Sequence, residues 1–170
     1  CWAVRRGQSH PPVNGEPDIG CYHLPESQAQ QSLCVPLIAQ GEAIGLLSFQ
    51  NITPETAPSR AYLELMAEAL GLALANQRLR DALLEIPAVR VYTAEGASLV
   101  TFNIEGMASQ VTASLLDEEG IAVRGGLHCA PGVHRCLGTL EGGAVRVSPG
   151  LMNTAADARA LIDAVAKIAG

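Results

Sequence analysis

One long helical pattern separates two parts of this chain that differ in character. Ser59 is a suitable N-cap for a helix that begins at Arg60, and the pattern runs to about Glu85 before Pro87 ends it. Apolar side chains seven residues apart form its stripe, and others broaden it: Leu65, Leu72, Leu79 and Ile86, with Met66, Ala69, Ala73, Ala75 and Leu83. Such a stripe serves either as core or as a dimer seam, and the periodicity alone favours core packing within the chain.

The part before the helix is rich in loops and contains one clear hairpin. Two apolar runs, residues 33–39 and 43–49, are joined by the short turn Gln40-Gly41-Glu42. The stretch 8–31 contains several prolines and glycines and shows little hydrophobic periodicity, which is typical of loops.

The part after Pro87 has the pattern of a compact domain of mixed structure. Strands are expected at 89–92, 99–104, 121–124 and 144–148, and helices at 107–118 and from the cap Thr154 to Ala169. This order, β-β-α-β-β-α, predicts an open sheet of about four strands with two helices on one face. The fold class is therefore α/β, more narrowly α+β, with a hairpin and a long helix joined to this small domain.

Charge and cysteine content exclude several classes of protein. The chain has 17 acidic and 11 basic side chains, so its net charge of −6 argues against a nucleic-acid binder. Apolar runs stay short of the roughly 18 residues of a membrane span, so no membrane contact is expected. Five cysteines are too few and too unevenly spaced for a disulfide scaffold, which favours a cytoplasmic location.

The expected loop 125–143 concentrates reactive side chains. Cys129 follows His128, and His134 and Arg135 lie nearby, with Arg124 at the base of the loop. A thiol near cationic groups loses its proton more readily, so Cys129 is a candidate nucleophile, although it can also be an idle cysteine in a loop. With Cys136, the two histidines and Cys129 offer a zinc ligand set, but their spacing matches no standard zinc motif.

Several segments of the second half resemble the end of a cysteine desulfurase of the class-V aminotransferase family. They are IPAVRVY (86–92), LVTFNIEG (99–106), IAVRGGLHCAP (121–131) and VRVSPGLMNT (145–154). The resemblance implies that Cys129 accepts sulfur from substrate cysteine as a persulfide and that Arg146 binds the substrate carboxylate. A paired hydrogen bond to a carboxylate suits an arginine, and Arg124 is the second candidate for that role.

The resemblance also implies pyridoxal phosphate for the whole family, but this chain lacks the large domain that would hold it. Its one lysine, Lys167, lies in a stretch unlike the family's cofactor-lysine motif, and a solvated surface charge is the expected role. No cofactor is therefore expected on this chain alone. A thiol-dependent hydrolase with His128 or, better, His134 as base is a further hypothesis.

The first half, residues 1–84, resembles the later part of a GAF domain, as found in bacterial sensor kinases and diguanylate cyclases. The resemblance rests on CWAVRRGQSH (1–10), CYHL (21–24), SLCVPLIAQGEAIGLLSF (32–49) and LALANQRLRDAL (72–83). It implies a ligand-sensing module, so a small-molecule ligand is a further expectation.

This half also carries three cysteines and a histidine of undecided role. Cys1, Cys21, His23 and Cys34 offer a tetrahedral set for zinc or iron, but they match no compact finger, and packed side chains are the alternative. No metal site is assigned to them from the sequence.

The chain is thus expected to join a partial GAF-like segment, 1–84, to a desulfurase-like small domain, 85–170. An incomplete GAF sheet leaves open edges, so we expect the halves to pack together or the chain to form a homo-oligomer. The helix 60–86 or the open sheet edges would carry the oligomer contact. The functional hypotheses are a sulfur-accepting thiol, a sensing or dimerising module, and a thiol hydrolase.

Overall fold

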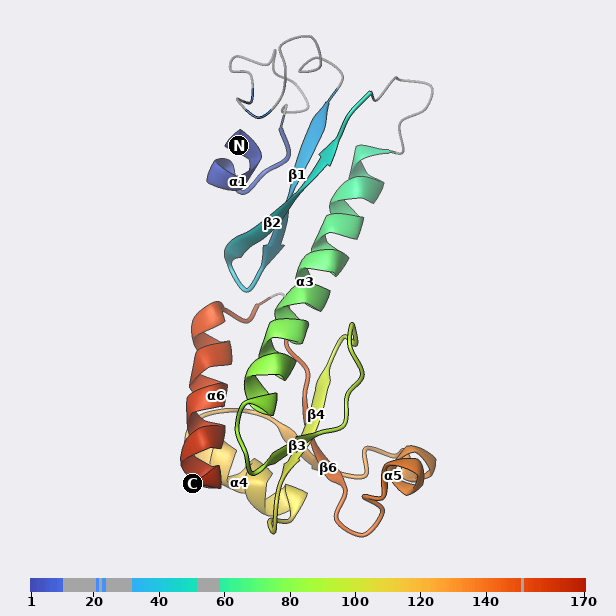
Figure 1. Cartoon of the computed structure of the whole chain (residues 1–170), viewed down its shortest axis with the longest axis vertical. Helices are drawn as coiled ribbons and strands as arrows, with labels where there is room; N and C mark the ends of the chain where they lie inside the picture. The colour runs from blue at the N-terminus through green and yellow to red at the C-terminus, as the bar shows by residue number, and fades with distance from the viewer. Residues whose placement is uncertain (11–20, 22, 24–31, 52–58, 151) are drawn as a thin grey trace. The chain divides into compact units, whose positions relative to one another are not determined.

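The computed structural model describes residues 1–10, 21, 23, 32–51, 59–150 and 152–170 (Figure 1). The chain divides into two compact units, Cys1–Leu72 and Ala73–Gly170, and each is described by itself. The stretch 8–31, expected to be loop, and the connector 51–59 lie largely outside the described residues. None of the described helices has the length and apolar character needed to cross a membrane.

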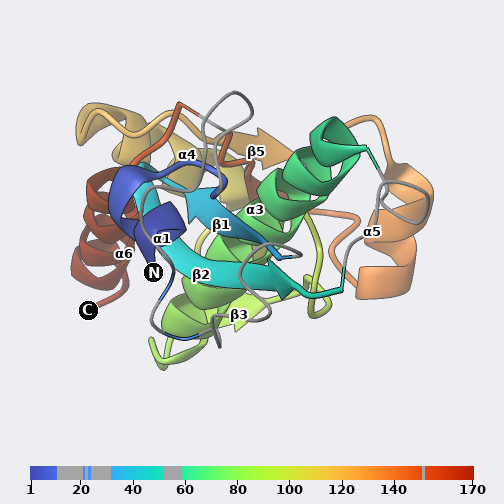
Figure 2. The ribbon, with the colours of Figure 1, turned by 90° about the horizontal axis from the view of Figure 1, so that it is seen from above.

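The expected hairpin forms the sheet of the first unit. β1 (Leu33–Ala39) pairs antiparallel with β2 (Glu42–Phe49), and the two strands lie side by side in both Figure 1 and Figure 2. Ala39 is opposite Glu42, so the loop consists of Gln40 and Gly41, both with positive φ. Positive φ at both central positions is the type I′ geometry that matches the twist of paired strands, so the hairpin prediction is confirmed.

The helix α3 (Arg60–Leu84) packs on this hairpin through small residues. Leu63 and Ala67 form a core cluster with Val35 and Leu37 of β1. A Cβ on Gly71 would lie 2.8 Å from the Ile38 carbonyl oxygen, so only glycine permits this approach of the helix to the strand.

The expected stripe on α3 is wrong in its first part. The most buried positions follow a four-residue step: Leu63, Ala67, Gly71, Ala75, Leu79 and Leu83. Leu65, which the seven-residue spacing placed in the stripe, is 63% exposed. The predicted stripe was based on the spacing of large side chains. The hairpin instead packs on the face of α3 where Ala67 and Gly71 let the two backbones approach. The N-cap is confirmed, because the Tyr62 amide donates to Ser59 Oγ at 3.3 Å.

The structure adds a short helix that the sequence analysis did not predict. α1 (Trp2–Arg6) ends at Gly7, whose φ of 63° is the left-handed geometry of a helix C-cap. Ala3 of this helix is buried with Cys21 and Cys34, and Trp2 packs against the cluster.

The second unit contains the predicted four-stranded sheet. Its strands run antiparallel in the order β3-β4-β6-β5, and β4 alternates buried and half-buried residues, as expected when one sheet face is covered. The strands are β3 (Val89–Val91), β4 (Val100–Ile104), β5 (Arg124–Gly126) and β6 (Ala144–Val147).

One core lies between this sheet and its helices. Leu79 and Leu83 of α3, Leu116 of α4 (Ser109–Glu118) and Leu161 of α6 (Ala155–Ala169) meet the strand residue Phe102, which is fully buried. The predicted cap of α6 is confirmed as a reciprocal capping box, in which Thr154 Oγ1 accepts from the Asp157 amide and the Asp157 carboxylate accepts from the Thr154 amide.

Two expectations for the second unit are wrong in detail. The third strand lies at Arg124–Gly126 instead of 121–124, because Ile121 and Val123 pack against the core from irregular backbone. The stretch 125–143 is not a continuous loop, since it contains α5 (Pro131–Leu137). The end of β5 lies close to the residue before β6: a Cβ on Gly143 would overlap the Gly126 carbonyl, and Gly143 has a φ of 64°.

Candidate functional site

A strained turn presents Cys129 between β5 and α5. The Ala130 amide donates to the Leu127 carbonyl at 2.9 Å, and the two residues inside the turn, His128 and Cys129, have φ values of 52° and 58°. Positive φ is uncommon for residues other than glycine, although asparagine, aspartate and histidine adopt it more often than most, and strained backbone of this kind clusters at functional sites. Cys129 is exposed at the tip of this turn.

His128 fastens the turn to the sheet. Its Nε2 lies 2.9 Å from the Ala144 carbonyl oxygen, which can only accept, so Nε2 carries the proton. Burial lowers the pKa of His128, and the positive charge of Arg146, followed by His134 and Arg124, lowers it further, outweighing the hydrogen bond to Ala144. His128 is therefore neutral at pH 7, and the positive charge near the turn comes from the arginines.

His134, the preferred base of the hydrolase hypothesis, is held inside the second unit. It is 3% exposed on α5, and its Nδ1 lies 2.8 Å from Thr139 Oγ1. The His128 and His134 rings lie 5.8 Å apart between centroids. Within the described part of the chain, no hydrogen bond joins the Cys129 thiol to either imidazole, so the hydrolase role stays a prediction without geometric support.

Arg124 and Arg146 occupy directly opposite positions on β5 and β6. Like charges facing each other across a sheet repel, and an anion bound between them relieves that repulsion. Arg146 is half-buried, and its Nε is buried without a hydrogen-bond partner among the described residues. The sequence analysis named both arginines as candidates to bind a substrate carboxylate. The structure adds that they lie opposite each other on neighbouring strands.

The zinc ligand set considered around Cys129 does not form, and Lys167 is a surface charge. Among the described residues, His128, Cys129, His134 and Cys136 do not converge to metal-ligand distances. The Lys167 side chain is 70% exposed and pairs with Glu119, as expected of a surface charge. Thr139, the partner of His134, is a residue that the sequence analysis missed, and no sequence signal marks it.

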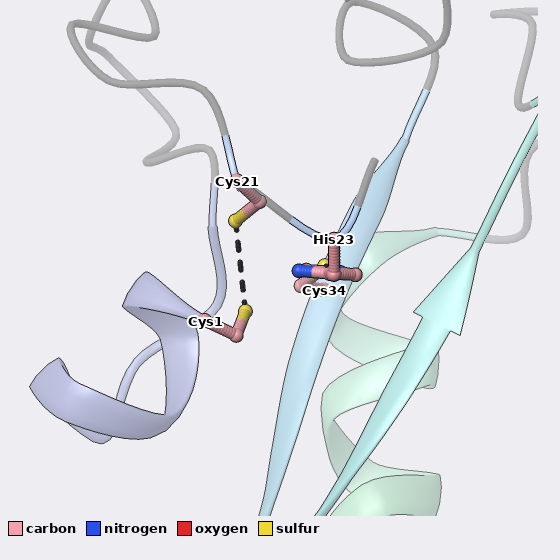
Figure 3. Close-up of side chains that lie close together, drawn as sticks. All are labelled: Cys1, Cys21, His23 and Cys34. Atoms are coloured by element: carbon pink, nitrogen blue, oxygen red, sulfur yellow. Dashed lines mark hydrogen bonds between the residues drawn. The ribbon is translucent and has the colours of Figure 1, made fainter. Parts of the chain in front are cut away.

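The structure does bring the cysteines and histidine of the first unit together. One ligand atom each from Cys1, Cys21, His23 and Cys34 lies within 4.8 Å of all the others (Figure 3). Cys21 and Cys34 are buried, Cys1 and His23 are exposed, and burial raises the pKa of Cys34.

The side chains of Arg5 and Arg6 lie over the Trp2 ring. Their guanidinium carbons are 5.6 and 5.2 Å from its centroid, distances at which a cation and an aromatic face attract.

Two family models match the chain. Residues 64–161 match aminotransferase class-V, and residues 7–77 match the GAF domain, so the two matches overlap on α3. Together they are consistent with a chain that joins parts of two families.

Several cysteine desulfurases are similar to this chain in sequence. A probable cysteine desulfurase of Pseudomonas putida is 43% identical over 105 residues, covering 62% of this chain and 26% of that protein. The cysteine desulfurase CsdA of Escherichia coli is 30% identical over 151 residues, covering 76% and 37%. The chain therefore spans well under half of the length of these relatives.

Solved structures agree with these matches. The apo cysteine desulfurase of Thermococcus onnurineus NA1 has a TM-score of 0.54 at 26% identity, over 62% of this chain and 28% of its own. Escherichia coli CsdA, in an S-sulfonic acid form, has a TM-score of 0.51 at 28% identity, over 78% and 38%.

Proposed function

The chain belongs to the class-V aminotransferase family, and from that premise we propose that its second unit is a cysteine-desulfurase-like small domain in which Cys129 accepts sulfur. The observation that carries the proposal is the exposed thiol at the tip of a turn with two consecutive left-handed residues. A turn built for stability alone would place asparagine or glycine at such positions. The strained geometry supports a role for the side chains that the turn presents.

The proposed step is a sulfur transfer between thiols. The Cys129 thiolate attacks the outer sulfur of a persulfide donor, and a new S–S bond forms at Sγ. The S–S bond of the donor breaks, the donor leaves as a thiolate, and the proton stays on the transferred sulfur. Charge and atoms balance without an added oxidant or reductant. The thiolate is the attacking form, so the step accelerates as the thiol loses its proton.

The remaining residues have supporting roles in this proposal. His128 is a positioning residue, because its hydrogen bond to Ala144 holds the turn against β6. Arg146 and Arg124 bind the carboxylate of the donor, for which the buried, unpartnered Nε of Arg146 is the supporting observation.

The residues of this chain do not suit the cofactor of the full-length relatives. Pyridoxal phosphate is held through a lysine amine, which needs a desolvated or otherwise activated site. Lys167 is exposed and ion-paired with Glu119. A cytoplasmic location and ligand sensing by the GAF-like segment stay predictions.

Sulfur transfer from a small-molecule persulfide tests the proposal. The reduced chain is mixed with cysteine persulfide, quenched at short times, and digested so that mass spectrometry locates each added sulfur atom. Cys129 is expected to gain sulfur first, and Cys136, also exposed and on the neighbouring helix α5, is the matched control thiol.

Variants separate attack from carboxylate binding. Cys129→Ser should abolish the fast phase, and Cys136→Ser should leave it unchanged. Arg146→Gln should slow transfer from cysteine persulfide but not from a persulfide donor without a carboxylate. Equal rates of modification at Cys129 and Cys136 would refute the proposal.

A further inference from the structure

We propose that Cys1, Cys21, His23 and Cys34 form a zinc site of three thiolates and one imidazole. The site lies in the first unit and is independent of the sulfur-accepting role proposed for Cys129. Among the described residues it is the one group of three or more metal-ligating side chains that converges.

The spacing of the ligand atoms fits a tetrahedral ion. Zn–S bonds of about 2.3 Å and Zn–N bonds of about 2.0 Å place tetrahedral ligand atoms roughly 3.5–3.8 Å apart. Cys1 Sγ and Cys21 Sγ are 3.6 Å apart, and Cys34 Sγ and His23 Nε2 are 3.5 Å apart. All other pairs lie within 4.8 Å, so small side-chain adjustments complete the tetrahedron.

The fold fixes the ligands from separate segments. Cys34 lies in β1, and both of its backbone groups bond to His10 at 2.8 Å, which ties the N-terminal segment to this strand. Cys1 caps α1, whose Ala3 is fully buried against Cys21 and Cys34. The four ligands thus come from three segments of the chain, around residues 1, 21–23 and 34, and the backbone already holds two of these segments together.

Packing alone accounts for only half of the cluster. Burial of Cys21 and Cys34 is ordinary behaviour for free cysteines, which are among the most buried residue types. Cys1 and His23 are exposed, so burial of apolar surface does not explain why their Sγ and Nε2 atoms meet the two buried thiols. A shared ion explains the convergence of all four.

The surroundings suit a closed structural site with an entry path. The Ser48 hydroxyl lies 3.9 Å from Cys34 Sγ, close enough to support the thiolate after a small movement. An open pocket of about 360 Å³, lined by Cys1, Trp2, Arg5, Cys21 and His23, connects the cluster to solvent. Four protein ligands leave no free position for substrate, which is typical of structural zinc.

Metal binding by the full reduced chain tests the site. We expect one zinc per chain to remain after dialysis against a weak chelator, measured by elemental analysis. Cobalt in its place should give the strong visible bands of tetrahedral thiolate coordination. Trp2 is the only tryptophan of the chain and packs against the cluster, so its fluorescence should follow the titration.

His23→Gln is the most informative variant, because His23 is exposed and its replacement leaves the buried cluster intact. It should weaken zinc binding at least about tenfold, and Cys34→Ser should do the same if that chain folds. Cys136→Ser, a change of an exposed cysteine in the other unit, should leave binding unchanged.

Three results would overturn the proposal. The first is the absence of stoichiometric zinc together with a Cys1–Cys21 disulfide in the purified chain. The second is iron, not zinc, as the ion retained during purification. The third is zinc binding that His23→Gln leaves unchanged or that Cys136→Ser removes.

Discussion

At the scale of single residues, the backbone of His128 and Cys129 is the most unusual feature of the second unit. Each non-glycine residue in a left-handed conformation costs about 1–2 kcal/mol. The hydrogen bond from His128 to Ala144 and the packing of the Gly126 and Gly143 backbones hold the turn in place. This conformational free energy is therefore spent at the two residues whose side chains the turn presents.

The first prediction concerns the titration of His128. Its pKa in the folded chain should lie below the ordinary value of 6.5, because the imidazole is partly buried and faces Arg146. Protonation therefore favours the unfolded chain. The stability that neutral His128 provides is fully present above about pH 6.5 and is lost as the pH falls through the folded pKa. Imidazole NMR and urea unfolding across this pH range measure both effects.

His128→Gln should flatten this part of the pH profile. Val133→Ala, at an exposed position on the adjacent helix, should keep it. A His128 resonance that titrates above 6.5 would contradict the burial of the imidazole and its proximity to Arg146.

Residue types identified part of the sites, but not their geometry. Cys129 and Arg146 could be identified from the sequence because each lies in a continuous motif that resembles the family. The orientation of His128 was not, since its partner is a backbone carbonyl 16 residues away. The four residues of the first-unit cluster could be named from the sequence, but only the bridge between His10 and Cys34 and the packing of α1 bring them together.

At the scale of elements, two neighbouring residues near the end of α3 differ in burial, and substituting each in turn tests which face of the helix is buried. Leu83 is fully buried in the core of the second unit, and Leu84 is 46% exposed. Leu83→Ala should lower the free energy of unfolding of this unit by about 2–5 kcal/mol, because it leaves a cavity. Leu84→Ala should change it by about 0.5 kcal/mol or less. Urea unfolding followed by circular dichroism compares the two variants, and similar losses would mean that the stripe is assigned wrongly.

Elements with a strong hydrophobic period were predictable, and short ones were not. The hairpin, α3, α4 and α6 were found within a few residues of their bounds. α5 has only seven residues and no apolar stripe, although Pro131 at its start and Gly138 after its end are recognised helix signals. β5 contains Gly125 and Gly126, which lack strand propensity, so its pairing with β6 decides its position.

At the scale of the whole molecule, two features leave surface for self-association. In the described residues β2 pairs with β1 alone, so its other edge is open. α3 also exposes a row of large apolar side chains along one side of the helix: Tyr62, Leu65, Met66, Leu70 and Leu74. This row contains no charged side chain that would select an oppositely charged partner, and the same row on a second copy matches it in length. We therefore propose pairing of α3 between two copies.

Replacement of one residue in this row tests the proposal. Leu65 is the most exposed member, so Leu65→Glu changes the surface and not the core, and buries a charge only if α3 pairs. The unaltered chain should sediment as a dimer at micromolar concentration, and Leu65→Glu should weaken the dimer at least about tenfold, which is about 1.4 kcal/mol. Val111→Glu introduces the same charge at an exposed position on α4 and should leave the dimer intact. A monodisperse monomer at all concentrations, with two separate melting transitions, would mean that neither α3 nor the β2 edge is covered by a second copy.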